Sequence, residues 1–172
     1  MNYGIVICLK SGAFAKERTD FIARLCSQAS PLYQYERDAT FGLSENGSIF
    51  YYFSTNENEV HALIQTSNTP AQGKVLNFYY GDVAPGHDEV IAPSVDFHRR
   101  VNAMNGRFSV LSLSIDDNIL SAATTITRME PVYKFENSDL IVVSTWAYSI
   151  NEVISALGLN PHSPSKSMIL LS

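Results

Sequence analysis

The chain has 172 residues, a length that suits one domain with a substantial buried core. Hydrophobic residues make up 45% of the sequence and charged residues 17%, which is typical of a globular protein. The net charge of −5 argues against a nucleic-acid-binding surface, and no basic cluster is larger than Arg99-Arg100. No apolar run approaches the roughly 20 residues of a membrane span, and residues 1–12 lack the pattern of a signal peptide. We therefore expect a cytoplasmic domain with no membrane or nucleic-acid partner.

The first half of the chain alternates apolar runs with amphipathic stretches. Residues 3–10 form a continuous β-branched apolar run, which predicts a strand buried on both faces. Residues 13–29 place apolar side chains at helical spacing opposite charged ones, which predicts an amphipathic helix. The same criteria predict short strands within 33–43, a strand over 47–53, a helix over 56–65, a polar loop over 66–73 and a strand over 74–80.

The second half is dominated by four apolar runs separated by turns rich in Asp, Asn and Ser. This pattern is typical of an antiparallel meander. Its strands are expected over residues 108–115, 119–127, 131–135 and 140–144. The meander is preceded by an acidic loop over 81–93 and a helix from a Ser94 cap to Met104, and it is followed by a helix over 149–157 capped by Ser149.

Together these elements predict an α+β fold in which two stacked antiparallel sheets are covered by helices. The domain spans residues 1–158, and the Pro- and Ser-rich residues 159–172 form a linker or docking tail. Consecutive aromatics at 50–53 and 78–80 point to both faces of their strands. We expect them to fill the core, although an interface on one face would also suit them.

Several short motifs resemble class II glutamine amidotransferase domains. Residues 101–110, with Asn105-Gly106 and Phe108, resemble the start of the family's core sheet. Further matches are residues 3–6, 80–82, 122–125, 131–133 and 140–144. The most similar families are the N-terminal domains of asparagine synthetases, β-lactam synthetases and lasso-peptide cyclases. The resemblance covers most of the chain and is concentrated in residues 101–144.

The resemblance implies an N-terminal-nucleophile (Ntn) hydrolase-like fold, which is a four-layer α/β/β/α sandwich of two antiparallel sheets. In active members a cysteine follows the initiator Met, its free α-amino group serves as the base, and its thiolate attacks the glutamine carboxamide. Asn2 occupies that position here. A side-chain amide cannot become a nucleophile at neutral pH, and a retained Met1 would also block the amine.

The other residues on which the family's glutaminase chemistry depends differ as well. Arg37-Asp38 is all that remains of the Arg-Gly-Pro-Asp segment that grips the glutamine carboxylate. Only the glycine of the oxyanion-hole Asn-Gly pair persists, in Tyr80-Gly81, and the aspartate of the second meander strand is replaced around Thr125-Ile126. We therefore expect that glutaminase activity is lost, and we interpret Asn105-Gly106 as a structural turn.

Two cysteines could in principle serve as unconventional nucleophiles. Cys8 lies in a predicted buried strand and Cys26 on the inner face of a predicted helix, so both are expected to be structural thiols. The alternative hypothesis is a divergent amide hydrolase or transferase. It predicts that glutamate is released from glutamine and that an electrophilic glutamine analogue labels Cys8 or Cys26.

The remaining polar residues suggest no catalytic, cofactor-binding or metal-binding site. Asp82 with the His-Asp-Glu run at 87–89 could bind a divalent cation or shuttle a proton, but a solvated loop is the simpler interpretation. His98 with Arg99-Arg100 is interpreted as surface charge. Neither His61 nor His162 has a metal-ligand spacing.

The sequence thus predicts a non-catalytic amidotransferase-like domain that pairs with an ATP-dependent, asparagine synthetase-like enzyme in biosynthesis. The Ser-Gly-Gly-x-Asp-Ser loop of the ATP-using domain does not occur in the chain, so a separate domain or subunit would have to supply it. Residues 168–171 would add a strand or dock against that partner. A third hypothesis is an unrelated α/β binding module that matches the family by chance.

Overall fold

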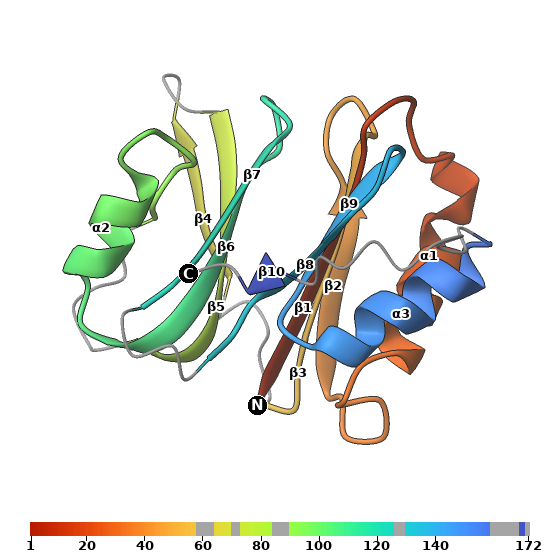
Figure 1. The fold of residues 1–172 in the computed structure, drawn as a ribbon, viewed down its shortest axis with the longest axis horizontal. Coiled ribbons are helices and arrows are strands. Elements are labelled where there is room, and N and C mark those ends of the chain that lie inside the picture. Colours follow the sequence, from red (N-terminus) through yellow and green to blue (C-terminus); the bar gives the residue numbers. More distant parts are fainter. Residues whose placement is uncertain (58–63, 70–72, 84–89, 126–129, 159–168, 171–172) are drawn as a thin grey trace.

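The computed structural model describes residues 1–57, 64–69, 73–83, 90–125, 130–158 and 169–170. Within these residues the chain forms two antiparallel sheets and three α-helices, which confirms the predicted α+β class (Figure 1). Every strand pairing in the two sheets is antiparallel.

The first sheet is built around the N-terminal strand and has the order β10-β8-β9-β1-β3-β2. Its strands are β1 (Asn2–Leu9), β2 (Asp38–Leu43), β3 (Ile49–Thr55), β8 (Tyr133–Glu136), β9 (Leu140–Ser144) and β10 (Ile169–Leu170). Successive side chains of β1 point to opposite faces, so Ile5 and Ile7 pack toward helices while Val6 packs toward the other sheet. Burial on both faces explains why residues 3–9 of β1 are apolar, as predicted.

The second sheet has the order β4-β5-β6-β7. Its strands are β4 (Ile64–Thr69), β5 (Gly73–Val83), β6 (Gly106–Ser114) and β7 (Ile119–Thr124). The long strand β5 pairs with β6 from Val75↔Ser114 to Val83↔Gly106. β7 forms one edge of this sheet.

Helices cover the outer faces of both sheets. α1 (Thr19–Gln28) and α3 (Ala147–Ala156) lie against the first sheet, and α2 (Phe97–Ala103) lies against the second (Figure 1). The predicted helix over 13–29 begins later than expected, because residues 13–15 are not helical and a short 3-10 turn, η1 (Lys16–Arg18), precedes α1. The buried face of α1 consists of Ile22, Ala23 and Cys26.

Three apolar clusters separate these layers. One lies between the first sheet and α1 and α3, one lies between the two sheets, and one lies between the second sheet and α2. In β3, Phe50 and Tyr52 belong to the first cluster, whereas Phe53 belongs to the second. In β5, Phe78 and Tyr79 likewise lie in different clusters. The prediction that the aromatic runs fill the core on both faces is therefore confirmed.

The prediction of one four-stranded meander is wrong. β6 and β7 form a hairpin in the second sheet, whereas β8 and β9 form a hairpin in the first. The chain therefore crosses from one sheet to the other between Thr124 and Tyr133. Alternation along each strand specifies a buried face, but it does not specify which hairpin lies beside which.

The predicted helix over 56–65 and loop over 66–73 are also corrected. Ile64 and Gln65 begin the strand β4, which continues through Thr69. β4 pairs with β5 from Ile64↔Phe78 to Thr69↔Gly73. A polar stretch forms this strand because pairing with a long neighbour outweighs its own weak β propensity. Residues 58–63 of the predicted helix lie outside the described residues.

Neither Ser94 nor Ser149 is an N-cap. α2 follows Asp96 and α3 follows Trp146, without a side-chain capping hydrogen bond at either helix. Ser149 lies in the first turn of α3 and donates to the Trp146 carbonyl at 2.7 Å. Ser144, at the end of β9, instead accepts the Trp146 N–H at 3.0 Å and so satisfies a donor at the start of the helix.

Candidate functional site at the start of β1

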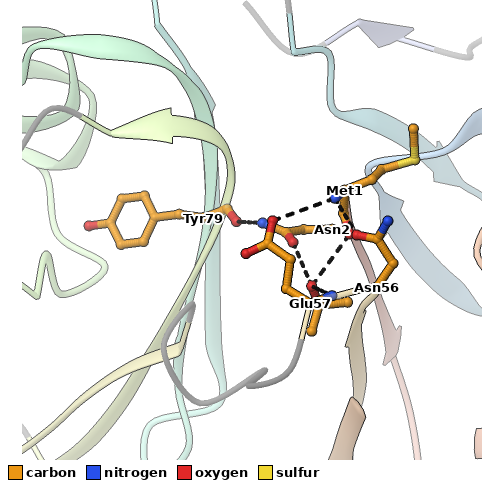
Figure 2. Close-up of polar contacts among 6 residues, drawn as sticks. Met1, Asn2, Asn56, Glu57 and Tyr79 are labelled. Carbon is orange, nitrogen blue, oxygen red and sulfur yellow. Dashed lines mark hydrogen bonds and ion pairs between the residues drawn. The ribbon is translucent and has the colours of Figure 1, made fainter. Parts of the chain in front are cut away.

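The start of β1 lies where the ends of three other strands meet. Asn2 is paired with Thr55 at the end of β3, and Thr55 is paired with Asp38 at the start of β2. From the opposite sheet, the end of β5 approaches Asn2 through the carbonyl of Tyr79 (Figure 2). Residues far apart in the sequence are thus brought to one end of the molecule.

Asn2 connects the two sheets through its side chain. Its amide oxygen accepts a hydrogen bond from the Thr55 hydroxyl at 3.0 Å, and its amide nitrogen donates to the Tyr79 carbonyl at 3.4 Å. The residue is only 8% exposed. With both ends of the amide bonded, Asn2 gives the buried Thr55 hydroxyl and the Tyr79 carbonyl an additional partner.

The amino group of Met1 lies beside the next turn of the chain. It donates to the Asn56 amide oxygen at 2.5 Å and lies 3.8 Å from the Glu57 carboxylate (Figure 2). The Met1 carbonyl in turn accepts the Asn56 N–H at 3.2 Å. Both Met1 and Glu57 are more than half exposed, so solvent screens this ion pair.

Two hollows flank this end of β1. One has a volume of about 220 Å³ and is lined by Met1, Asn2, Glu57, Tyr80, Gly81, Asp82 and Glu130. The other has a volume of about 370 Å³ and is lined by Gln34, Tyr35, Glu36, Arg37 and Asn56. The first hollow is therefore lined by three acidic residues, Glu57, Asp82 and Glu130, together with the N-terminal residue Met1. The second is lined by Arg37, the arginine that resembles part of the family's Arg-Gly-Pro-Asp segment.

The structure brings together three of the four segments that the resemblance relates to catalysis. Asn2 and the pair Tyr80-Gly81 line the same hollow, and Arg37 lines the neighbouring one. The backbone N–H of Arg37 donates to the Thr55 carbonyl at 2.9 Å, which ties this segment to the end of β3, just before Asn56. Gly81 has a φ of +104° and packs against the Arg107 backbone, so a side chain there would be strained.

The Asn2 side chain is not a nucleophile, because an amide has no proton that a neutral base removes at ordinary pH. Of the carboxylates that line the same hollow, Glu130 is hydrogen-bonded to the Tyr80 phenol. Burial, and next the neighbouring Glu130 carboxylate, raise the pKa of the Tyr80 phenol. Tyr80 is therefore a hydrogen-bond donor at neutral pH, and not a base.

Both cysteines lie away from this site. Cys26 lies on the buried face of α1, and burial raises the pKa of its thiol. Cys8, at the other end of β1, is half-buried, and burial raises its pKa to about 12. Thiols with raised pKa values are poor nucleophiles at neutral pH.

The other residues singled out from the sequence are dispersed. His98, Arg99 and Arg100 lie on α2, where Arg99 forms an exposed ion pair with Asp96 at 3.2 Å. Asp82 lies at the end of β5, while the His-Asp-Glu run at 87–89, His61 and His162 lie outside the described residues.

The described ranges contain no group of three or more His, Cys, Asp or Glu side chains arranged to hold a metal ion. Among the helices placed by the structure, none has the length and apolar character needed to cross a membrane.

Sequence reasoning missed the partners of Asn2. Thr55, Asn56, Glu57 and Glu130 surround the start of β1, yet none of them belongs to a recognisable motif. Their proximity follows from the β1–β3 register and from the crossing between the sheets, and neither is written in local periodicity.

No protein-family model matches the chain, and no curated protein is significantly similar to it in sequence.

Proposed function

We propose that the chain is a class II glutamine amidotransferase-like domain of the four-layer α/β/β/α, Ntn-hydrolase type that has lost glutaminase activity. We further propose that it serves as a structural or docking partner of an ATP-dependent, asparagine synthetase-like enzyme. The proposal rests on the residue resemblance together with one observation: Asn2, Arg37 and Tyr80-Gly81 meet at one end of the molecule.

The layer order supports the architectural part of the proposal. α1 and α3 lie outside one antiparallel sheet and α2 lies outside the other (Figure 1). The even-numbered side chains of β1 face the second sheet, so the residue in the nucleophile's position points between the sheets.

The environment of Asn2 supports the loss of catalysis. Its amide is engaged on both sides, by the Thr55 hydroxyl and the Tyr79 carbonyl. The Met1 amino group contacts Asn56 and Glu57, and a retained Met1 leaves residue 2 without the free α-amino group that an N-terminal nucleophile uses as its base. Such a cluster stabilises the junction of the sheets, and it offers nothing that could form an acyl-enzyme.

A glutaminase assay tests the catalytic half of the proposal. The purified chain is expected to release no glutamate from glutamine above the background, and an electrophilic glutamine analogue is expected to label neither Cys8 nor Cys26. Mass spectrometry of the tryptic peptides reads out the labelling, with a Cys8→Ser/Cys26→Ser variant as the blank. Glutamate release that is lost in this variant would establish the divergent-hydrolase alternative.

Recovery of the native complex tests the claim that the chain binds an ATP-dependent synthetase. The tagged chain, purified from its own cells, is expected to carry an enzyme that exchanges pyrophosphate with ATP in the presence of its carboxylic acid substrate. Because the proposed domain supplies no ammonia, amide formation by the complex should depend on added ammonia or amine and be indifferent to glutamine. A complex without ATP-dependent ligase activity, or one that requires glutamine, would refute the proposal.

A further inference from the structure

A cavity lies between the two sheets at the end of β1 opposite to Asn2. Its volume is about 420 Å³, and its described lining comes from β1, β3, β7, β8, β9 and α2. Small-molecule sites commonly measure about 300–1,000 Å³, so this cavity is large enough to hold a ligand.

Uneven packing between the sheets explains why the cavity is there. Near the start of β1, Phe53 and Phe78 stack at 4.5 Å and fill the space above Gly4. Near the end of β1, the lining residues that face between the sheets carry no aromatic ring. They are Cys8, Ile49, Leu120, Ala122, Ile141 and Val143. The inner wall of the cavity is therefore mostly aliphatic, while Ser48, His98, Asn118, Ser121 and Lys134 supply its polar lining.

The mouth of the cavity carries excess positive charge. Lys134 lines the cavity, and its ammonium group lies 2.6 Å from the Glu136 carboxylate. Lys10 lies 2.7 Å from the other oxygen of the same carboxylate. Two ammonium groups thus share one carboxylate, which leaves a net charge of about +1 for this trio at neutral pH. The chain as a whole carries −5, so this local excess is unlike the rest of the protein.

The Glu136 carboxylate is ionised at neutral pH. The hydrogen bonds from Lys10 and then Lys134 lower the pKa of Glu136 to about 2. The trio is therefore a fixed feature of the cavity mouth. Lys134 is about one-quarter exposed at its side chain, so a ligand anion can reach its ammonium group.

We propose that this cavity binds a medium-chain aliphatic carboxylate, with the chain between the sheets and the carboxylate group beside Lys134. The aliphatic walls bury the chain, and the charge excess of the Lys10–Glu136–Lys134 trio accepts the anion. This binding does not depend on the proposed function, because it uses the opposite end of β1.

A series of three ligands separates the burial of the aliphatic chain from the binding of the carboxylate group. Octanoate is the probe, octan-1-ol carries the same chain without charge, and acetate carries the charge without the chain. Octanoate is expected to bind saturably, about fivefold or more tightly than octanol, since one screened ion pair contributes on the order of 1 kcal/mol. Amide shifts in the NMR spectrum should concentrate at residues 118–122 and 141–143. Equal binding of octanol and octanoate, or shifts elsewhere, would overturn the proposal.

Two variants test the residues themselves. Lys134→Met keeps the length of the side chain but removes its charge, and it should weaken octanoate binding about fivefold without changing octanol binding. Lys16→Met, on η1 away from the cavity, is the matched control and should bind octanoate normally. If Lys134→Met bound octanoate as tightly as the control, the anion site would be excluded.

The unmodified protein offers a test that requires no variant to fold. Cys8 lines the cavity, so methyl methanethiosulfonate at alkaline pH should modify it slowly, and octanoate should slow the reaction further. Cys26 lies in a different cluster, and its rate should not respond to octanoate. A Cys8 rate that is the same with and without saturating octanoate would contradict binding in this cavity.

Discussion

Asn2 shows how one buried side chain can join two sheets. Its side chain bonds to Thr55 in one sheet and to the Tyr79 carbonyl in the other. Both contacts are buried, so loss of the amide leaves the Thr55 hydroxyl and a carbonyl with fewer partners. Asn2, at the position where the proposed family carries its nucleophile, thus stabilises the contact between the two sheets.

The first prediction concerns the stability that Asn2 provides. Asn2→Ala should lower the free energy of unfolding by about 1–2 kcal/mol, because it removes two buried hydrogen bonds. Urea denaturation measures the change. Asn56→Ala is the control from the same site, and it should change stability by about 0.5 kcal/mol or less because its contact with Met1 is exposed. Equal effects of the two substitutions would contradict this account.

Gly4 leaves the space that the aromatic stack between the sheets requires. A Cβ atom at this position would lie 2.8 Å from the Phe78 ring, which is itself fully buried and stacked on Phe53. The ring has no free direction in which to move. A glycine in the middle of a buried strand is therefore explained by close packing, and not by backbone conformation.

We predict that Gly4→Ala destabilises the protein by about 1–3 kcal/mol through overpacking. A double-mutant cycle with Phe78→Leu checks the cause, since the smaller side chain relieves the clash. The two substitutions should be less damaging together than the sum of their separate effects. Strict additivity would show that the cost of Gly4→Ala arises elsewhere.

At the level of the elements, α3 is attached to the first sheet by a chain of hydroxyl groups. Ser144 donates to the Gly4 carbonyl at 3.1 Å, accepts the Trp146 N–H at 3.0 Å and lies 2.9 Å from the Ser149 hydroxyl. This network connects β1, β9 and the first turn of α3. It replaces the side-chain cap that α3 lacks.

Ser144→Ala should therefore cost about 1–3 kcal/mol, because it removes the buried hydrogen bond to the Gly4 carbonyl and leaves the part-buried Trp146 N–H without this acceptor. Ser155→Ala, at an exposed position of the same helix, is the matched control and should be nearly neutral. Hydrogen exchange of the α3 amides should show faster opening in Ser144→Ala alone. Unchanged exchange would mean that apolar packing, and not this network, positions the helix.

Glu136, in the hairpin of β8 and β9, makes a contribution to the stability of the fold that depends on pH. Its pKa falls to about 2 in the folded protein because Lys10 and Lys134 bind the charged form. A depressed carboxyl pKa stabilises the fold above the unfolded pKa, and this contribution is lost as the pH falls through the folded pKa. Glu136 therefore stabilises the protein most at neutral pH.

Glu136→Gln tests this contribution. The variant should be less stable than the natural protein at pH 6, by a small amount because the ion pairs are exposed. The difference should shrink below about pH 4.5 and vanish near pH 2. Denaturation curves at these pH values measure it. A difference that stays constant over this range would exclude the ion pairs as its source.

Across the whole molecule, the C-terminal segment is joined to the first sheet by a short contact. Ile169 and Leu170 form β10 and pair with Lys134 and Tyr133 at the edge of the sheet. Such a pairing corresponds to one of the two roles expected for the tail, the addition of a strand. A strand of two residues contributes little to stability.

Removal of residues 159–172 should consequently leave the free energy of unfolding within about 1 kcal/mol of the full chain. If the tail docks against the proposed synthetase partner, the same truncation should weaken their association, by about tenfold or more. Calorimetry measures the first effect and titration against the recovered partner measures the second. Unchanged binding by the truncated chain would exclude a docking tail.

Local patterns predicted most elements well where one face or both faces of an element are buried. β1, β6 and β9 were predicted from continuous or alternating apolar runs, and the aromatics of β3 and β5 were placed in the core. β4 was missed because its sequence is polar and its strand depends on β5. The proposed caps failed because a serine's role depends on which backbone groups lie near it.

The sequence by itself determined the α+β class, the two-sided burial of β1 and the presence of an asparagine at position 2. Only the tertiary structure decided that the supposed meander is divided between two sheets, that Asn2 meets Thr55 and Tyr79, and that Lys134 faces a cavity. The physical reason is that periodicity records how each segment is buried. The register and the order of strands depend on contacts between segments distant in the chain, and those form only when the sheets pack.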